Sequence, residues 1–262
     1  MTQYENEVKK RDVMCCMNAG NQGCGRKWSR MRIITDTGTD ILDIEAKKLG
    51  IELVAIRSNF TDTVFSENTE AEFTRFYDKL RQTDTLPVSS QPSPAEFLEL
   101  FEDAKEKQEE VVVITISSKL SGTYNGAMLA KDMAEYDNIY VVDSLQASLS
   151  ERLLVEYAVK LRDAGMGAKE LVRKLEQDRE RVILTGVPST LLYLKMGGRI
   201  SPVVAAVGGV IGIKPVLWLK DGVIESRSKA RGMRMAKSGM QSFLKDYEAD
   251  PAMPVMFAHS DN

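Results

Sequence analysis

Histidine is nearly absent from this chain, whose 262 residues contain only His259. A metal site built from several histidines is therefore excluded, and imidazole acid–base chemistry has a single candidate. Cysteine is scarce as well: all three cysteines lie within residues 1–30 without a neighbouring histidine, which makes a poor cage for zinc. We therefore expect no metal centre.

Long apolar runs and an excess of positive charge are also missing. No run reaches the roughly 18 apolar residues that span a membrane, and residues 1–12 lack the apolar core of a secretion signal. The net charge is -3 and the isoelectric point is near 5.5, so the basic surface typical of nucleic-acid binding is absent. These absences predict a cytoplasmic protein without a membrane span and without a nucleic-acid partner.

What is present is an alternation of strands and helices that starts abruptly at Met31. The preceding residues 1–30 are polar and aperiodic, and we expect them to be a mostly disordered extension upstream of the natural start. Residues 31–35 predict a strand, a helix follows that ends at Gly50, and residues 51–60 predict a second strand. This order favours a parallel sheet with a right-handed crossover.

The central feature is a strand over 111–116, a polar loop over 117–121 and a helix that opens at Gly122 and Thr123. Six apolar or β-branched residues in a row suit a strand that is covered on both faces of a parallel sheet. The helix start offers backbone N–H groups and the positive end of its dipole, which together favour an anion. Alternatively, Ser121 only caps its own helix and binds nothing.

A second polar segment, residues 88–91, is flanked by prolines and carries Ser89 and Ser90. Proline fixes its own φ and restricts the preceding residue, so we expect a stiff extended segment. Such a segment makes a turn or gives a ligand contact a rigid mounting. Capping-box spacings predict two helices near this segment, one after Thr69 and one after Ser93.

We predict two domains. Residues 31–165 form an N-terminal α/β domain with a parallel sheet, and residues 166–262 form a C-terminal α+β domain. The second domain contains a hairpin that turns at Asp221–Gly222, and it ends with an apolar strand from residue 254. Because no helix or strand follows that strand, the C-terminal domain looks truncated. The other elements expected there are a strand over 181–188, a short helix over 189–195 and an apolar helix over 201–212.

Seven separated segments occur in one fixed order: ITDTGTDI, SSQPSPAEF, ISSKLSGTY, LLYLKMGGRIS, IKPVL, KARG and AHSD. Together they resemble the DegV family of bacterial fatty-acid-binding proteins, over residues 32–262. The resemblance implies a non-enzymatic protein whose two domains enclose one long-chain fatty acid, with no other cofactor. Some members are the binding subunit of fatty acid kinase, and they present the carboxylate to a separate ATP-dependent kinase that forms an acyl phosphate.

The resemblance also assigns a ligand site. It implies that Ser89 holds the carboxylate and that Ser121 is a second contact, with the backbone N–H groups of Gly122 and Thr123 nearby. It assigns a third contact to His259, in the AHSD segment. The physics is compatible with this, because hydroxyl, amide and imidazole donors bind a carboxylate without a full counter-charge.

Further residues follow from the resemblance and from departures from it. Arg199, in GGRIS, resembles a surface arginine that contacts the kinase. The segment over 59–70 lacks the Gly–Asp pair that is usual in the family. Glu151 and Arg152 replace smaller residues, and we expect them to change the lining of the acyl tunnel.

Two enzymatic alternatives stay open. Ser121 and His259 could be the nucleophile and base of a hydrolase, although no G-x-S-x-G elbow is present. Asp36, Asp40 and Asp143 could instead bind Mg²⁺ for phosphoryl transfer, although no glycine-rich phosphate loop accompanies them. A regulatory DNA-binding protein is a third class, and the acidic balance argues against it.

Overall fold

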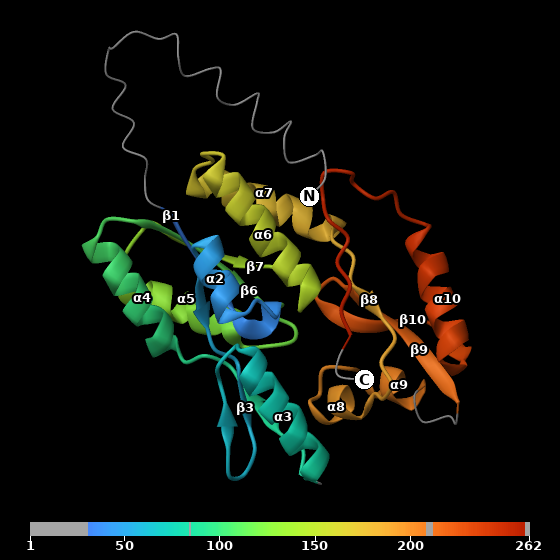
Figure 1. Cartoon of the computed structure of the whole chain (residues 1–262). Helices are drawn as coiled ribbons and strands as arrows, with labels where there is room; N and C mark the ends of the chain where they lie inside the picture. The colour runs from blue at the N-terminus through green and yellow to red at the C-terminus, as the bar shows by residue number, and fades with distance from the viewer. Residues whose placement is uncertain (1–30, 84, 208–211, 260–262) are drawn as a thin grey trace.

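The computed structural model describes residues 31–83, 85–207 and 212–259 (Figure 1). The extension expected over residues 1–30 lies outside this part of the chain, as do residues 208–211 of the expected apolar helix.

A parallel sheet of four strands forms the first half of the molecule, as predicted. Its strand order is β2-β1-β6-β7, and every neighbouring pair is parallel. The chain therefore crosses over between strands instead of turning back in hairpins. The strands are β1 (Met31–Asp36), β2 (Glu52–Val54), β6 (Glu110–Thr115) and β7 (Ile139–Asp143).

Helices cover both faces of this sheet, which explains the unbroken apolar run in β6. Side chains alternate between the faces, so Val112 packs in one core cluster and Val113 in the other. The first cluster contains residues of α2 (Asp43–Leu49), α6 (Leu149–Asp163) and α7 (Ala168–Asp178). The second contains residues of α4 (Pro94–Glu106) and α5 (Thr123–Ala134).

Local signals set the helix ends as expected. Thr69 caps α3 (Glu70–Gln82) by accepting from the backbone N–H of Glu72, and Ser93 forms a capping box with Glu96 at the start of α4. Gly50 ends α2 with a φ of 60°, the left-handed conformation that glycine adopts without strain.

The strand predicted over residues 51–60 is divided between two sheets. Its first part is β2, whereas β3 (Arg57–Asn59) joins a small antiparallel sheet of order β4-β3-β5. A tertiary contact lies at the break between β2 and β3. The Thr37 hydroxyl accepts from the backbone N–H of Ile56 at 2.9 Å, so this N–H is not available to a strand partner. Rings hold the small sheet against α3: Phe65 and Phe76 have centroids 5.5 Å apart. The other two strands are β4 (Val64–Phe65) and β5 (Val88–Ser90).

A second antiparallel sheet, of order β10-β9-β8, forms the C-terminal half. Its hairpin turns at Asp221–Gly222, where both residues have positive φ (50° and 81°), as the predicted two-residue turn requires. The expected strand over 181–188 shrinks to two residues. The elements are β8 (Thr185–Gly186), α8 (Leu192–Met196), α9 (Pro202–Val207), β9 (Ile213–Lys220), β10 (Val223–Arg231) and α10 (Gly232–Leu244).

Two features of the C-terminal half differ from expectation. The helix α7 was not predicted, and its Leu171 and Leu175 pack in the core of the first sheet. This contact favours a domain boundary after α7 instead of at residue 166, and the division into domains stays a prediction. The strand predicted from residue 254 is wrong for residues 254–259, which form neither helix nor strand. A strand needs a ladder partner, and here Phe257 is 84% exposed.

Candidate functional site

The loops that follow β1, β6 and β7 are tied together by aspartates at the strand ends. Asp36 accepts from the backbone N–H groups of Gly38 and Ile116, at 2.9 and 2.8 Å. Asp143 accepts from the backbone N–H of Ser118 at 3.0 Å. These carboxylates therefore organise the loop over 116–121. Within the described ranges no three acidic, histidine or cysteine side chains are placed to hold a metal ion, so nothing in the geometry favours the magnesium alternative.

Ser121 and Thr123 form a hydroxyl pair at the start of α5. The Ser121 Oγ lies 2.9 Å from the Thr123 Oγ1 and accepts from the backbone N–H of Thr123 at 3.4 Å. Thr123 is buried, whereas Ser121 and Gly122 are partly exposed. The N-cap position of α5 is Gly122, without a side-chain cap bond, so Ser121 is not the N-cap that the alternative expected; its contact with an anion stays a prediction.

The serine segment 88–91 lies against the start of α5, where Gln91 contacts Gly122. A Cβ added to Gly122 would clash with the Oε1 of Gln91, so only glycine allows this close approach. One turn further along, a Cβ at Gly126 would lie 3.6 Å from the carbonyl oxygen of Pro92. The two segments expected to hold the carboxylate are far apart in sequence, and the structure brings them into contact. Sequence reasoning missed Gln91, which makes that contact.

Strand register separates Ser89 from Ser90. Residues directly opposite one another in an antiparallel pair share a face of the sheet. Ser58 of β3 is opposite Ser89 on one side and Phe65 on the other, so these three residues form one row on one face. Ser90 is on the opposite face, where its Oγ accepts from the Asn59 Nδ2 at 2.9 Å.

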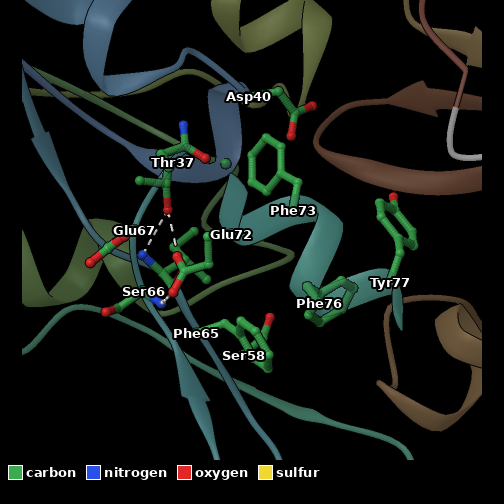
Figure 2. A pocket seen from close by; sticks show the side chains of 13 residues that line it. Thr37, Asp40, Ser58, Phe65, Ser66, Glu67, Glu72, Phe73, Phe76 and Tyr77 are labelled. Atoms are coloured by element: carbon green, nitrogen blue, oxygen red, sulfur yellow. Dashed lines mark hydrogen bonds between the residues drawn. The ribbon is translucent and has the colours of Figure 1, made fainter. Parts of the chain in front are cut away.

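The face that carries Ser58 and Phe65 borders a cavity of about 280 Å³. Figure 2 shows Phe73, Phe76 and Tyr77 of α3 around one side of it. The Thr37 hydroxyl is bonded to the main chain of Ile56 at 2.9 and 3.4 Å, the dashed contacts in Figure 2. The remaining lining residues are Gly38, Asp40, Ile56, Ser58, Phe65, Ser66, Glu67, Asn68 and Glu72.

Two carboxyl groups are fully buried beneath the site. Burial raises the pKa of Asp36 to about 7, against the two backbone N–H groups that favour its charged form. Burial also raises the pKa of Glu151 well above its ordinary value, and the charge of Asp36 adds to that effect. A Cβ on Gly38 would lie 2.7 Å from the Asp36 Oδ1 and 3.3 Å from the Glu151 Oε2, so both carboxyl groups pack against this glycine.

Glu151 and Arg152 are not among the residues that line this cavity, and their expected effect on an acyl tunnel stays a prediction. Glu151 is inside the protein, and neither carboxyl oxygen has a hydrogen-bond partner among the described residues. Arg152 points to the other side of α6, where it pairs with Glu45 and Glu156 at 2.8 Å each. The helical offset of about 100° between successive residues explains why neighbours in sequence separate in this way.

Arg199 connects the two halves of the molecule. Its Nε donates to the carbonyl oxygen of Leu120 at 3.1 Å, and its Nη1 donates to that of Gly197 at 2.5 Å. A second bond of the same kind runs from the Ser117 Oγ to the carbonyl oxygen of Gly222 at 2.8 Å. The structure therefore shows Arg199 in contact with the loop that leads to Ser121. The arginine is only partly exposed, and its role in docking a kinase stays a prediction.

His259 is exposed at the end of the described chain. No hydrogen bond joins it to Ser89 or Ser121 in the part of the chain that the structure describes. The hydrolase alternative requires a bond between serine and histidine, and the described geometry does not supply one.

Comparison with known proteins identifies relatives across most of the chain. A family model described as "Uncharacterised protein, DegV family" matches residues 30–262. A DegV domain-containing protein of Caldanaerobacter subterraneus is 31% identical over 233 residues, which cover 88% of this chain and 83% of that protein. Within the described residues, no helix is long and apolar enough to cross a membrane.

Solved structures match the fold as well. A fatty-acid-binding DegV family protein from Thermus thermophilus has a TM-score of 0.74 and 31% identity, with coverage of 83% of this chain and 77% of that one. The Fatty Acid Kinase (Fak) B3 protein of Streptococcus pneumoniae, loaded with linoleic acid, has a TM-score of 0.72 and 28% identity, with coverage of 83% and 78%. The two-domain α/β fold expected from the sequence is the fold of these neighbours.

Proposed function

This chain belongs to the DegV family, and on that premise we propose that it binds a single long-chain fatty acid and presents the carboxylate to a partner kinase. Two observations support the proposal. The solved neighbours include proteins described as fatty-acid-binding or loaded with a fatty acid. The serine segment meets the start of α5, and its Ser89 is paired with Ser58, which lines a cavity whose walls are partly aromatic.

In this proposal the carboxylate lies where Gln91 approaches Gly122. Ser89 and Ser121 donate their hydroxyl protons to it, and the backbone N–H groups of Gly122 and Thr123 add the positive end of the α5 dipole. Hydrogen bonds to a charged acceptor are worth about 1.5–3 kcal/mol each, so these donors hold the ion without a cationic side chain. His259 is the proposed third donor, and a fatty-acid titration of His259→Ala tests it: unchanged affinity would remove it from the site.

The acyl chain supplies most of the binding free energy. At about 0.8 kcal/mol for each buried methylene, a chain of about 14 methylenes gains roughly 11 kcal/mol before ordering costs. We propose that the chain occupies a tunnel that includes the cavity between α3 and the β3–β4 hairpin. The row Ser89, Ser58 and Phe65 supports this direction, because it leads from the proposed head group to the cavity on one face.

The proposed reaction is carried out by the kinase. A carboxylate oxygen attacks the γ-phosphorus of ATP, the bond to ADP breaks, and an acyl phosphate forms. This chain contributes the position of the carboxylate and no catalytic residue, metal or cofactor, and we place it in the cytoplasm, where ATP is available. Arg199 is the proposed kinase contact. Its guanidinium group bonds to the carbonyl oxygen of Gly197, directly after α8, and to that of Leu120, in the loop that leads to Ser121. A kinase that binds Arg199 would therefore be close to the proposed head group.

The contact of Gln91 with Gly122 is the observation that carries the proposal, because it unites the two predicted carboxylate contacts. Native mass spectrometry of the purified full chain tests the binding function. We expect a non-covalent adduct with the mass of one C16–C18 acid, which denaturation releases. Protein that lacks an adduct and also fails to take up palmitic acid after lipid removal would contradict the proposal.

A further inference from the structure

The polar side of the cavity beside α3 is acidic. Three lining residues carry carboxyl groups, Asp40, Glu67 and Glu72, and no described lining residue carries a positive charge. Like charges repel most strongly where water is scarce, so this cavity disfavours the carboxylate end of a fatty acid. The acyl chain is therefore the part of the ligand that suits it.

The apolar side of the cavity is aromatic, and its rings are not fully packed. Four aromatic residues line it, and each is only half-buried: Phe65, Phe73, Phe76 and Tyr77. Protein interiors are otherwise close-packed. The apolar surface that these rings present to the cavity therefore suits an apolar ligand.

Phe76 is at the centre of the aromatic side. Its ring meets those of Phe65 and Tyr77 edge to face, with centroids 5.5 and 5.4 Å apart, and it lies between them in Figure 2. It also contacts the ring of Phe60 at 5.8 Å, and Phe60 contacts Phe65 at 5.7 Å. Phe60 is 8% exposed and is not among the lining residues, so it lies behind Phe65 and Phe76. Together these three rings form an aromatic wall.

The segments that carry the aromatic wall are joined to each other. Lys79, one turn beyond Phe76 in α3, pairs with Asp62 in the β3–β4 turn at 2.5 Å. The backbone N–H of Phe60 donates to the carbonyl oxygen of Thr63 at 2.8 Å across the same turn. A surface ion pair adds little free energy by itself, but this one connects the helix to the hairpin. Packed rings on connected elements resist displacement, so an acyl chain that reaches them ends there.

Strand register places the aromatic wall away from the proposed head group. Ser89 of β5 is opposite Ser58, and Ser58 is opposite Phe65 of β4. Because β4 is an edge strand of the small sheet, no further strand continues this row beyond Phe65. A chain that starts at Ser89 and follows the row meets the aromatic wall last.

From this arrangement we infer that Phe76 determines the longest acyl chain that the protein binds, because its ring closes the cavity at the end remote from the carboxylate. The inference rests on the proposed fatty-acid binding and specifies the chain length for the same site. Each methylene buried in front of the aromatic wall should raise the affinity about fourfold. A methylene that would have to pass the wall finds no space and should lower the affinity.

Binding of a series of saturated fatty acids to the delipidated full chain tests the inference. The series runs from C12 to C22 in steps of two carbons, and competition with a fluorescent fatty acid measures each affinity. In the wild type we expect the affinity to rise about fifteenfold for each step and to fall once the chain meets the aromatic wall. In Phe76→Leu, whose side chain is smaller, this break should move about one step towards longer chains.

Two further variants separate specificity from folding. Phe76→Trp enlarges the ring and should move the break towards shorter chains, so it tests the inference even if Phe76→Leu fails to fold. Phe97→Leu makes the matched substitution in α4, at a fully buried ring that is not among the lining residues. It should lower stability and leave the break in place.

The possible failures are distinguishable. If the wild type binds fatty acids but the break stays at one chain length in the folded Phe76 variants, the inference is overturned and the proposed function stands. An equal shift in Phe97→Leu would overturn it too, because the effect would then come from general loosening of the fold. So would a wild-type affinity that rises through the whole series. If no fatty acid binds at all, the proposed function itself fails.

Discussion

Raising the pH from 5 to 8 should destabilise this protein, because Asp36 and Glu151 are fully buried with raised pKa values. The folded state then holds protons that the unfolded chain has released. The free energy of unfolding therefore falls as the pH rises from the unfolded pKa towards the folded pKa, and it levels off above the latter. Acidic groups with lowered pKa values have the opposite effect, and only at lower pH.

The magnitude follows from Asp36, whose pKa rises from 3.8 to about 7. Each pH unit well below the folded pKa corresponds to about 1.4 kcal/mol, and Asp36 is half titrated at pH 7, so Asp36 alone removes about 2 kcal/mol between pH 5 and 7. Glu151 adds to the loss in the same direction. Glu96 has its pKa lowered to about 2, chiefly by the hydrogen bond from Arg57, so its contribution is already complete above pH 5 and does not oppose the trend.

Urea unfolding at pH 5, 6, 7 and 8, followed by far-ultraviolet circular dichroism, measures the effect. In Glu151→Gln the loss of stability should be smaller than in the wild type, because one of the two titrating groups is gone while the side-chain volume is kept. Glu67→Gln, at an exposed side chain, should reproduce the wild-type slope. A wild-type stability that is constant or rises between pH 5 and 8 would refute the reasoning.

Three further substitutions test particular contacts. Ser121→Ala should weaken fatty-acid binding by about 1.5–3 kcal/mol in a calorimetric titration. Its control is Ser93→Ala, which removes a cap from α4 and should lower stability without changing affinity. Equal affinities for the two variants would show that Ser121 does not contact the ligand. Arg199→Ala should slow phosphorylation of the bound acid by the partner kinase far more than it weakens binding, and equal losses would contradict a docking role. Gly222→Ala should destabilise the fold by about 1–3 kcal/mol in urea unfolding, since the φ of Gly222 is 81° and an added Cβ would lie 2.6 Å from the Ser117 Oγ. Gly198→Ala is the control: its φ is 71° but its Cβ would meet no atom within 4 Å, so it should lose less stability.

Local signals made much of the fold predictable from the sequence. The apolar run of β6, the capping box at Ser93 and the turn at Asp221–Gly222 each fix a few residues through their own chemistry, and the structure confirms them. The unpredicted helix α7 also had a usable signal. Its Ala168, Leu171 and Leu175 are spaced along one face at helical intervals, and all three are buried.

The remaining features depend on contacts between distant segments. The break after β2 is stabilised by Thr37 on Ile56, and residues 254–259 have no ladder partner in the described part of the chain. Serine and glycine at the proposed head-group site were predictable as residue types. Their meeting through Gln91 was not, nor was the burial of Glu151, because both result from packing between elements.

The position of the carboxylate is the central claim, and nuclear magnetic resonance of palmitic acid labelled with ¹³C at the carboxyl carbon tests it most directly. One bound acid at the site of Ser89 and Ser121 predicts a single bound resonance, distinct from that of the free acid. It should shift in Ser89→Ala and in Ser121→Ala, and it should stay unchanged in Ser90→Ala, whose hydroxyl is on the other face of the sheet. A bound resonance that is insensitive to both Ser89→Ala and Ser121→Ala would contradict the account.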